Sequence, residues 1–122
     1  ELNTSGEIRV HIDLTCKEDV LDCAAKTFAL LKMHKTKLRN GVLIYLSIQD
    51  HKFAIIGDAG INSKVPENFW ETTKQVMLDN FKENNLTEGL VTGIKMAGEQ
   101  LKKYFPYQDD DVNELNNEIS FG

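Results

Sequence analysis

The chain has 122 residues, a hydrophobic fraction of 41% and a net charge of −5 at pH 7, values that are typical of one ordinary globular domain. No cluster of Lys and Arg stands out, so the sequence lacks the basic patch with which proteins bind nucleic-acid phosphates. Its longest apolar run, Val42 to Leu46, is much too short to span a membrane. We therefore expect one domain over residues 1–122, a monomer that does not bind nucleic acid and has no membrane-spanning segment.

The first expected elements are a strand over residues 7–14 and a helix over residues 16–32. In the strand, apolar and polar residues alternate, as they do where one face of a sheet is more polar. Thr15 and Glu18 have the spacing of a capping box, which favours a helix start at residue 16. Five residues recur on one face of that helix: Val20, Ala24, Thr27, Phe28 and Leu31.

The two cysteines, Cys16 and Cys23, are seven residues apart and lie in or beside this expected helix. In a helix, that spacing corresponds to a rise of about 10 Å, which is too long for a disulfide. We therefore expect two free thiols, which favour a reducing compartment and hence the cytoplasm. No signal peptide is visible at Glu1, and the sequence leaves open whether an export signal has been removed.

A β-hairpin is expected over residues 40–62, which read NGVLIYLSIQDHKFAIIGDAGIN. Two apolar runs flank a polar turn at residues 49–52, the pattern of two strands joined by a short connection. Both runs are almost continuously apolar, which indicates strands that are covered on both faces. With the preceding strand and helix, the hairpin completes a right-handed β-α-β unit, so the expected sheet is mixed.

Two further helices are expected, over residues 66–82 and from Thr87 to about Phe105. Pro66 suits a first helical turn, and Pro106 disfavours a helical conformation in the residue before it. Residues 107–122 then form an acidic C-terminal tail. Its apolar residues are too many for a free tail, and we expect some of them to dock on the domain: Val112, Leu115, Ile119 and Phe121.

A candidate cation site lies in the loop Gly57-Asp58-Ala59-Gly60, at the end of the hairpin. Because the last strand is antiparallel to the other two, Asp58 should share one rim of the sheet with Glu7 and with Asn40-Gly41. The glycines permit a sharp bend and close approach of a ligand, and hard cations prefer carboxylate and carbonyl oxygens. The alternative is that Asp58 caps a turn or the following helix.

The tail carries a second group of carboxylates, which we expect to complete the site: Asp109, Asp110, Asp111 and Glu114. Adjacent carboxylates repel one another unless a cation or solvent relieves them. Side chains of consecutive residues diverge in an extended segment, so we expect at most two of these residues to bind one cation directly. Docking of the tail would bring them to the rim that holds Asp58. The alternative is that the tail is solvated and binds no cation.

The hairpin with its Gly-Asp-x-Gly end, the Phe69-Trp70 pair, the segment LKKYFPY and the tail DDDVNEL resemble the TPM domain family, in particular its short, soluble bacterial branch, close to marine flavobacterial proteins. The resemblance covers residues 7–121. It implies a three-layer α/β/α sandwich with a small mixed central sheet, and calcium or magnesium binding in loops at one end. Many relatives carry an aromatic residue where Asp58 stands here.

Two functions follow from this resemblance. The first is a Ca²⁺- or Mg²⁺-binding TPM-type domain that acts as a regulatory or interaction module, since some members assist photosystem repair or modulate a membrane receptor. The second is a metal-dependent acid phosphatase that acts on phosphomonoesters, as plant members are reported to be. The sequence shows no nucleophile and no phosphate-cradling loop. A plain interaction domain without a cation is the third possibility.

Overall fold

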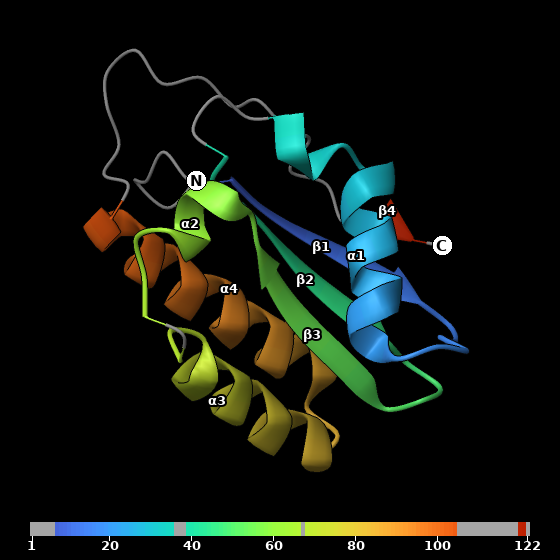
Figure 1. Ribbon diagram of the computed structural model, residues 1–122. Coiled ribbons are helices and arrows are strands. Elements are labelled where there is room, and N and C mark those ends of the chain that lie inside the picture. The colour runs from blue at the N-terminus through green and yellow to red at the C-terminus, as the bar shows by residue number, and fades with distance from the viewer. Residues whose placement is uncertain (1–6, 36–38, 67, 105–119, 122) are drawn as a thin grey trace.

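A mixed β-sheet forms the centre of the molecule (Figure 1). The computed structural model describes residues 7–35, 39–66, 68–104 and 120–121. Within these residues the strand order is β3-β2-β1-β4. Strand β1 is parallel to β2 and to β4, while β3 is antiparallel to β2. The bounds are Glu7–Asp13 for β1, Gly41–Ser47 for β2, Lys52–Gly57 for β3 and Ser120–Phe121 for β4.

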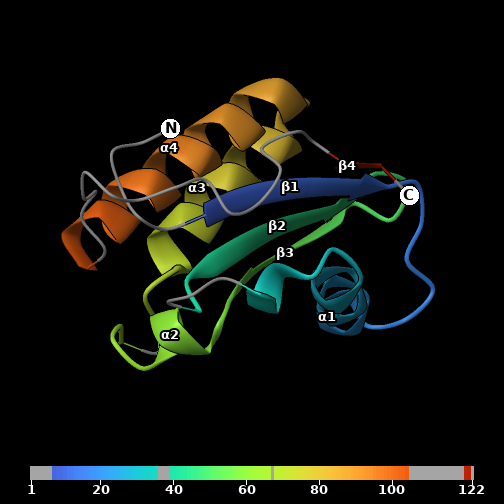
Figure 2. The same ribbon diagram turned by 90° about the horizontal axis from the view of Figure 1, so that it is seen from above.

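Helices cover both faces of the sheet, which confirms the expected three-layer arrangement (Figure 2). One face carries α1 (Val20–Leu30) and the short 3₁₀ turn η1 (Met33–Lys35), and the other carries α3 (Glu71–Lys82) and α4 (Leu86–Tyr104). The central strand β2 is buried along its whole length. The continuous apolar run in the sequence is therefore explained, because each face of β2 packs against a helical layer.

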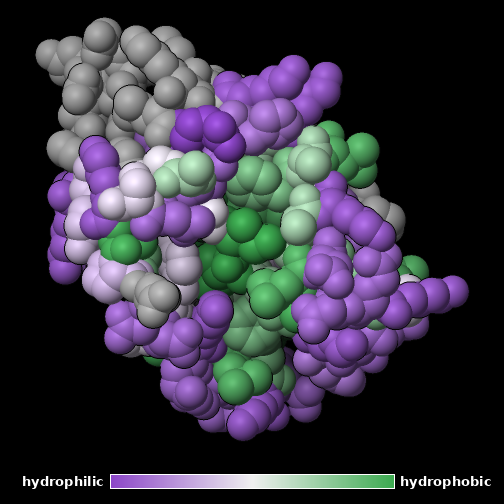
Figure 3. Space-filling model, in the orientation of Figure 1, coloured by the Kyte–Doolittle hydropathy of each residue, from purple (hydrophilic) through white to green (hydrophobic). Residues whose placement is uncertain are grey.

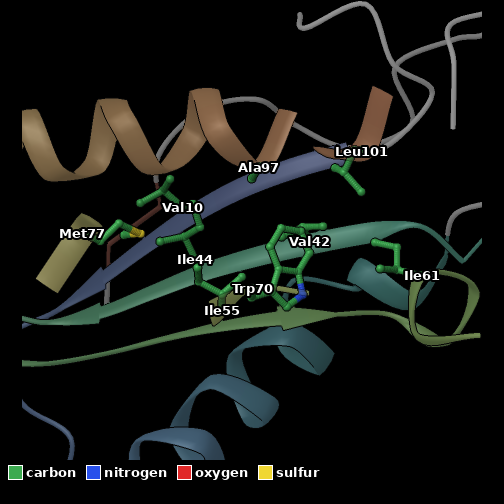
Figure 4. Close-up of a cluster of buried hydrophobic side chains, with 9 residues drawn as sticks. All are labelled: Val10, Val42, Ile44, Ile55, Ile61, Trp70, Met77, Ala97 and Leu101. Atoms are coloured by element: carbon green, nitrogen blue, oxygen red, sulfur yellow. The ribbon is translucent and has the colours of Figure 1, made fainter. Parts of the chain in front are cut away.

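The larger hydrophobic core lies between the sheet and the α3–α4 layer (Figure 4). Alternate residues of β2, Val42 and Ile44, point into it, whereas Leu43 and Tyr45 belong to the core under α1. Helices α3 and α4 approach closely: a Cβ atom on Gly93 would lie only 2.5 Å from the sulfur of Met77. The other members of the larger core are Val10, Ile55, Ile61, Trp70, Ala97 and Leu101.

The predicted start of the first helix, at residue 16, is wrong. Helix α1 begins at Val20, and its N-cap is Asp19, whose carboxylate accepts a hydrogen bond from the backbone N–H of Leu21. Asp is as good an N-cap as Thr, so the capping pattern at Thr15 had a competitor four residues later. The start of the next long helix is also later than predicted, at Glu71 rather than Pro66.

The prediction of free thiols is wrong as well, because Cys16 and Cys23 form a disulfide with their Cα atoms 6.3 Å apart. The sequence estimate placed both residues in one helix. In the structure Cys16 lies in the loop before α1, and this loop brings it beside the first turns of the helix. The disulfide removes the support that free thiols gave to a cytoplasmic location.

A short helix, α2 (Ala59–Asn62), follows β3 directly and was not expected. Four residues are too few for a helical pattern to emerge from the sequence. The ends of α3 and α4 agree better with expectation: Asn84, where the sequence breaks the helix, has a left-handed backbone with φ of 63°, which is typical just after a helix end.

The end of the C-terminal tail returns to the sheet. Strand β4 pairs with β1 through Ser120 opposite His11 and Phe121 opposite Ile12. This pairing lies near the last residue of β1, at the end of the sheet away from Glu7. Residues 105–119, which include the expected docking residues Val112, Leu115 and Ile119, lie outside the described part of the chain.

Candidate cation site at the rim of the sheet

The rim predicted from topology is confirmed. Glu7 lies opposite Gly41 at the start of the β1–β2 pair, and Asp58 follows the last residue of β3. Three backbone hydrogen bonds tie the rim together: the N–H of Glu7 donates to the carbonyl of Asn40 (3.3 Å), that of Asp58 to Gly41 (2.9 Å), and that of Gly60 to Arg39 (2.8 Å). Glu7 and Asp58 therefore flank Gly41 on either side.

The carboxylate of Asp58 is buried and held from two directions. Arg39 donates from Nε to Oδ2 (2.7 Å) and from Nη2 to Oδ1 (2.9 Å), a bidentate ion pair. The backbone N–H of Ala59 donates to Oδ1 (2.7 Å), so Asp58 also caps α2. The side chain of Asp58 is only 6% exposed, whereas that of Arg39 is 51% exposed. A buried anion is thus paired with a cation that reaches it from solvent.

Electrostatics favour the ionised form of Asp58. Burial by itself raises the pKa of this carboxyl group, but the hydrogen bonds from Arg39 and Ala59 and the positive charge of Arg39 outweigh burial, so the pKa lies below its ordinary value. In turn, the hydrogen bond to Asp58 and the negative charge of Asp58 raise the pKa of Arg39. Asp58 is consequently a permanent carboxylate near neutral pH, as a cation ligand must be.

Glu7 is the second acidic residue that the structure places at the rim, and it too is buried, with 6% of its surface exposed. The other expected ligands, Asp109, Asp110, Asp111 and Glu114, lie outside the described residues. Within the described part of the chain, no three His, Cys, Asp or Glu residues gather in a way that could hold a metal ion. Because Ca²⁺ takes about six to eight oxygen ligands, Glu7 and Asp58 alone do not form a complete site.

Arg39 is the rim residue that sequence analysis missed. It has a left-handed backbone, with φ of 51°, a conformation that is unusual for a residue other than glycine. Its position in the sequence, directly before Asn40-Gly41, was the signal that could have identified it. Strand direction places Asn40-Gly41 beside Asp58, so Arg39 should lie near Asp58 as well. Nothing in the local sequence pairs two residues that are 19 positions apart.

A separate polar cluster lies at the opposite half of β1 and β2, on the α1 side of the sheet. Asp13 accepts a hydrogen bond from the hydroxyl of Tyr45 (2.5 Å), and its other oxygen lies 2.8 Å from Nε2 of His11. The rings of His11 and Tyr45 are stacked with their centres 5.9 Å apart. Burial, followed by the hydrogen bond and charge of Asp13, raises the pKa of Tyr45. These contacts therefore give the three polar side chains hydrogen-bond partners on a mostly buried face of the sheet.

Asp50, in the hairpin turn, links that turn to the disulfide loop. Its carboxylate accepts hydrogen bonds from the backbone N–H of Cys16 (2.5 Å) and from the hydroxyl of Ser47 (2.7 Å). These two bonds lower the pKa of Asp50. The disulfide loop, the hairpin turn and the end of β2 are therefore held as one unit at the end of the sheet away from Asp58.

Comparison with known proteins agrees with the fold and the motifs. In the described residues, no helix has the length and apolar character needed to cross a membrane. The family model of the TPM domain matches residues 1–100. The chain is similar to the BA42 protein of the psychrophilic bacterium Bizionia argentinensis, whose NMR structure has 52% sequence identity and a TM-score of 0.92, over 98% of this chain and 83% of that chain. The chain matches no curated protein. By the family match, which spans most of its length, the chain belongs to the TPM domain family.

Proposed function

We propose that this TPM domain binds a divalent cation, Ca²⁺ or Mg²⁺, at the rim and acts as a regulatory or interaction module. The observation that carries the proposal is the pair of buried acidic residues, Glu7 and Asp58, on either side of Gly41. Carboxylate oxygens are the ligands that hard cations such as Ca²⁺ and Mg²⁺ prefer, and the two residues stand on neighbouring strands at one end of the sheet.

Arg39 has a specific role in this proposal, as the group that neutralises Asp58 when no cation is bound. The side chain of Arg39 is half exposed, so its guanidinium can turn towards solvent when a cation takes its place at Asp58. A cation at Asp58 has to displace or share this ion pair, and the competition lowers its affinity. We therefore expect weak binding, and we expect the remaining oxygen ligands from the acidic run at residues 109–114.

The test is a titration of the full chain with CaCl₂ and MgCl₂, followed by amide NMR. Binding at the rim predicts shifts at Arg39 to Gly41 and at Gly57 to Ile61, and further shifts at residues 109–114. Asp58→Asn should remove the shifts at the rim. Asp79→Asn is the matched control, because Asp79 is an exposed carboxylate that accepts a hydrogen bond from Gln75 on α3. If millimolar calcium leaves the rim amides unmoved, the proposal is wrong.

Metal-dependent hydrolysis of phosphomonoesters is the second candidate function. One observation favours it: Arg39, whose side chain is half exposed, stands at the proposed cation site, and Arg binds phosphoryl oxygens in bidentate fashion. The same protein should then hydrolyse p-nitrophenyl phosphate only with a divalent cation, and Asp58→Asn should abolish turnover while the amide spectrum keeps its dispersion. Turnover that does not exceed the buffer blank would exclude this function.

A further inference from the structure

A pocket of about 540 Å³ opens at the end of the molecule away from the rim. It lies between two turns, the β2–β3 hairpin turn and the connection from α3 to α4. Its volume falls in the range of small-molecule sites. On the face shown in Figure 3, hydrophobic surface is exposed between more hydrophilic surface on either side. The residues that line the pocket are Leu46, Ser47, Ile48, His51, Phe53, Leu78, Phe81, Lys82, Asn84 and Leu86.

The walls of the pocket are mainly apolar and are already in place. The rings of Phe53 and Phe81 pack edge to face, with centres 5.2 Å apart, and so join the sheet to α3. Ile48, at the hairpin turn, and Leu86, the first residue of α4, are 39% and 37% exposed, so part of their apolar surface faces solvent at the pocket. A ligand with an apolar chain would cover these side chains and remove their surface from water.

Lys82 is the one formally charged side chain among the residues that line the pocket. The chain as a whole is acidic, with 19 Asp and Glu against 14 Lys and Arg, yet no Asp or Glu is among the residues that line the pocket. Lys82, at the end of α3, brings an ammonium group, and His51, in the hairpin turn, brings a ring N–H donor. An apolar cavity with cationic and donor groups is complementary to an anionic head on an apolar tail.

We propose that this pocket binds an amphipathic carboxylate of the fatty-acid type. The acyl chain lies against Phe53, Phe81 and Leu78, and the carboxylate is near Lys82 and His51. This site is independent of the proposed cation site, because the pocket contains the end of β2 and the start of β3, whereas Asp58 follows the end of β3.

The test is a titration of the full chain with sodium decanoate, followed by amide NMR. We expect saturable shifts at Leu46 to Ile48, at His51 and at Leu86. Decanoate should bind about tenfold more tightly than octanoate, because two more CH₂ groups leave water. The uncharged decanol should bind less tightly than decanoate.

The role of charge is tested with Lys82→Met, which keeps most of the side-chain length. It should weaken decanoate binding by about three- to fivefold, as expected for a partly exposed ion pair, and leave decanol binding unchanged. Lys102→Met is the matched control, because Lys102 is likewise an exposed lysine in the last turn of a helix, but it does not line the pocket. The amide spectra of both variants show whether each is folded.

Three results would overturn the proposal. Shifts that gather instead at Leu14, Leu21 and Leu30, which are exposed apolar residues elsewhere, would mean unspecific adsorption. Equal affinity for decanoate and decanol would mean that no group at the pocket recognises the anion. Shifts at the pocket that grow with protein concentration and without any ligand would mean that the occupant is a second copy of the chain.

Discussion

At the scale of single residues, the ion pair between Arg39 and Asp58 defines the chemistry of the rim. A carboxylate that is almost fully buried would be costly without its partner. The pair joins the segment before β2 to the segment after β3, and so it also stabilises the fold. Substitutions in this ion pair should therefore change both the free energy of unfolding and the binding of a cation at the rim.

Arg39→Asn tests this ion pair, and Asn is chosen because it tolerates the left-handed backbone of Arg39. Burial raises the pKa of Asp58, but the hydrogen bonds from Arg39 and Ala59 have the opposite and larger effect. The pKa of Asp58 in the folded protein is therefore below its ordinary value. A pKa that is lowered in the folded state contributes stability that is present above the ordinary carboxyl value and is lost as the pH falls through the folded value. We expect Arg39→Asn to reduce the free energy of unfolding at pH 7, and to reduce it by less at an acidic pH below the ordinary carboxyl pKa of about 4. Urea unfolding at both pH values measures this, and an equal loss at both would contradict it.

Tyr45 gives a second prediction, at the opposite end of the pH range. Its pKa is raised, first by burial and then by Asp13, so the folded state favours the neutral phenol. That contribution to stability is present below the ordinary tyrosine pKa of about 10 and is lost as the pH rises above it.

Tyr45→Phe should therefore cost about 1 kcal/mol at neutral pH, through the lost hydrogen bond to Asp13. Its stability should also fall less steeply than that of the wild type above about pH 10. Chemical unfolding over that pH range measures both effects, and Tyr104→Phe serves as a control for the loss of a phenol. An unchanged slope in Tyr45→Phe would contradict the assignment.

At the scale of elements, the disulfide and the hairpin turn determine how α1 begins. Cys16 is linked covalently to Cys23 in α1 and by its backbone N–H to Asp50 in the turn. These contacts connect the loop before α1 to two elements that are far apart in sequence. The first turn of α1 is consequently fixed by more than its N-cap, Asp19.

The double variant Cys16→Ser/Cys23→Ser should be less stable than the oxidised wild type by about 2 kcal/mol, the value expected for a short closed loop. Urea unfolding measures this difference, and amide exchange should become faster in the first turn of α1. A reducing agent should lower the stability of the wild type and leave the variant unchanged. Two free thiols in the wild type, counted by mass spectrometry after alkylation, would contradict the disulfide.

The elements that could be predicted from sequence are those whose pattern is long and local. The hairpin was predicted because β2 and β3 are apolar runs on either side of a polar turn, and the rim followed from strand direction alone. The disulfide was missed because its geometry depends on the path of the loop at Cys16. Arg39 was missed because its pairing with Asp58 depends on tertiary structure, and α2 was missed because it is only four residues long.

At the scale of the whole molecule, the two ends of the sheet have different chemistry. One end carries the buried carboxylates and Arg39, and the other carries an apolar pocket with Lys82 and His51. The chain returns to β1 through β4 after the acidic run, so a deletion of the tail would also remove a strand. Substitution is therefore the better way to examine the tail.

Replacement of Asp109, Asp110 and Asp111 by Asn, together with Glu114→Gln, should weaken calcium binding at least about tenfold, which corresponds to roughly 1.4 kcal/mol. Isothermal titration calorimetry or the NMR titration measures the affinity. A variant with Asp79→Asn, Glu83→Gln, Glu88→Gln and Glu99→Gln, which removes four exposed carboxylates of the α3–α4 layer, controls for the same change in net charge. Unchanged affinity in the tail variant would mean that the acidic run is solvated and supplies no ligand.

The central claim, a divalent cation at the rim, is tested most directly with Mn²⁺, whose unpaired electrons broaden the NMR signals of nearby amides. The proposal predicts that substoichiometric Mn²⁺ broadens Glu7, Arg39 to Gly41 and Gly57 to Ile61 first, that excess Ca²⁺ or Mg²⁺ restores these signals, and that Asp58→Asn removes the effect. Broadening that is centred on the hairpin turn at His51, or spread evenly over the surface, would contradict it.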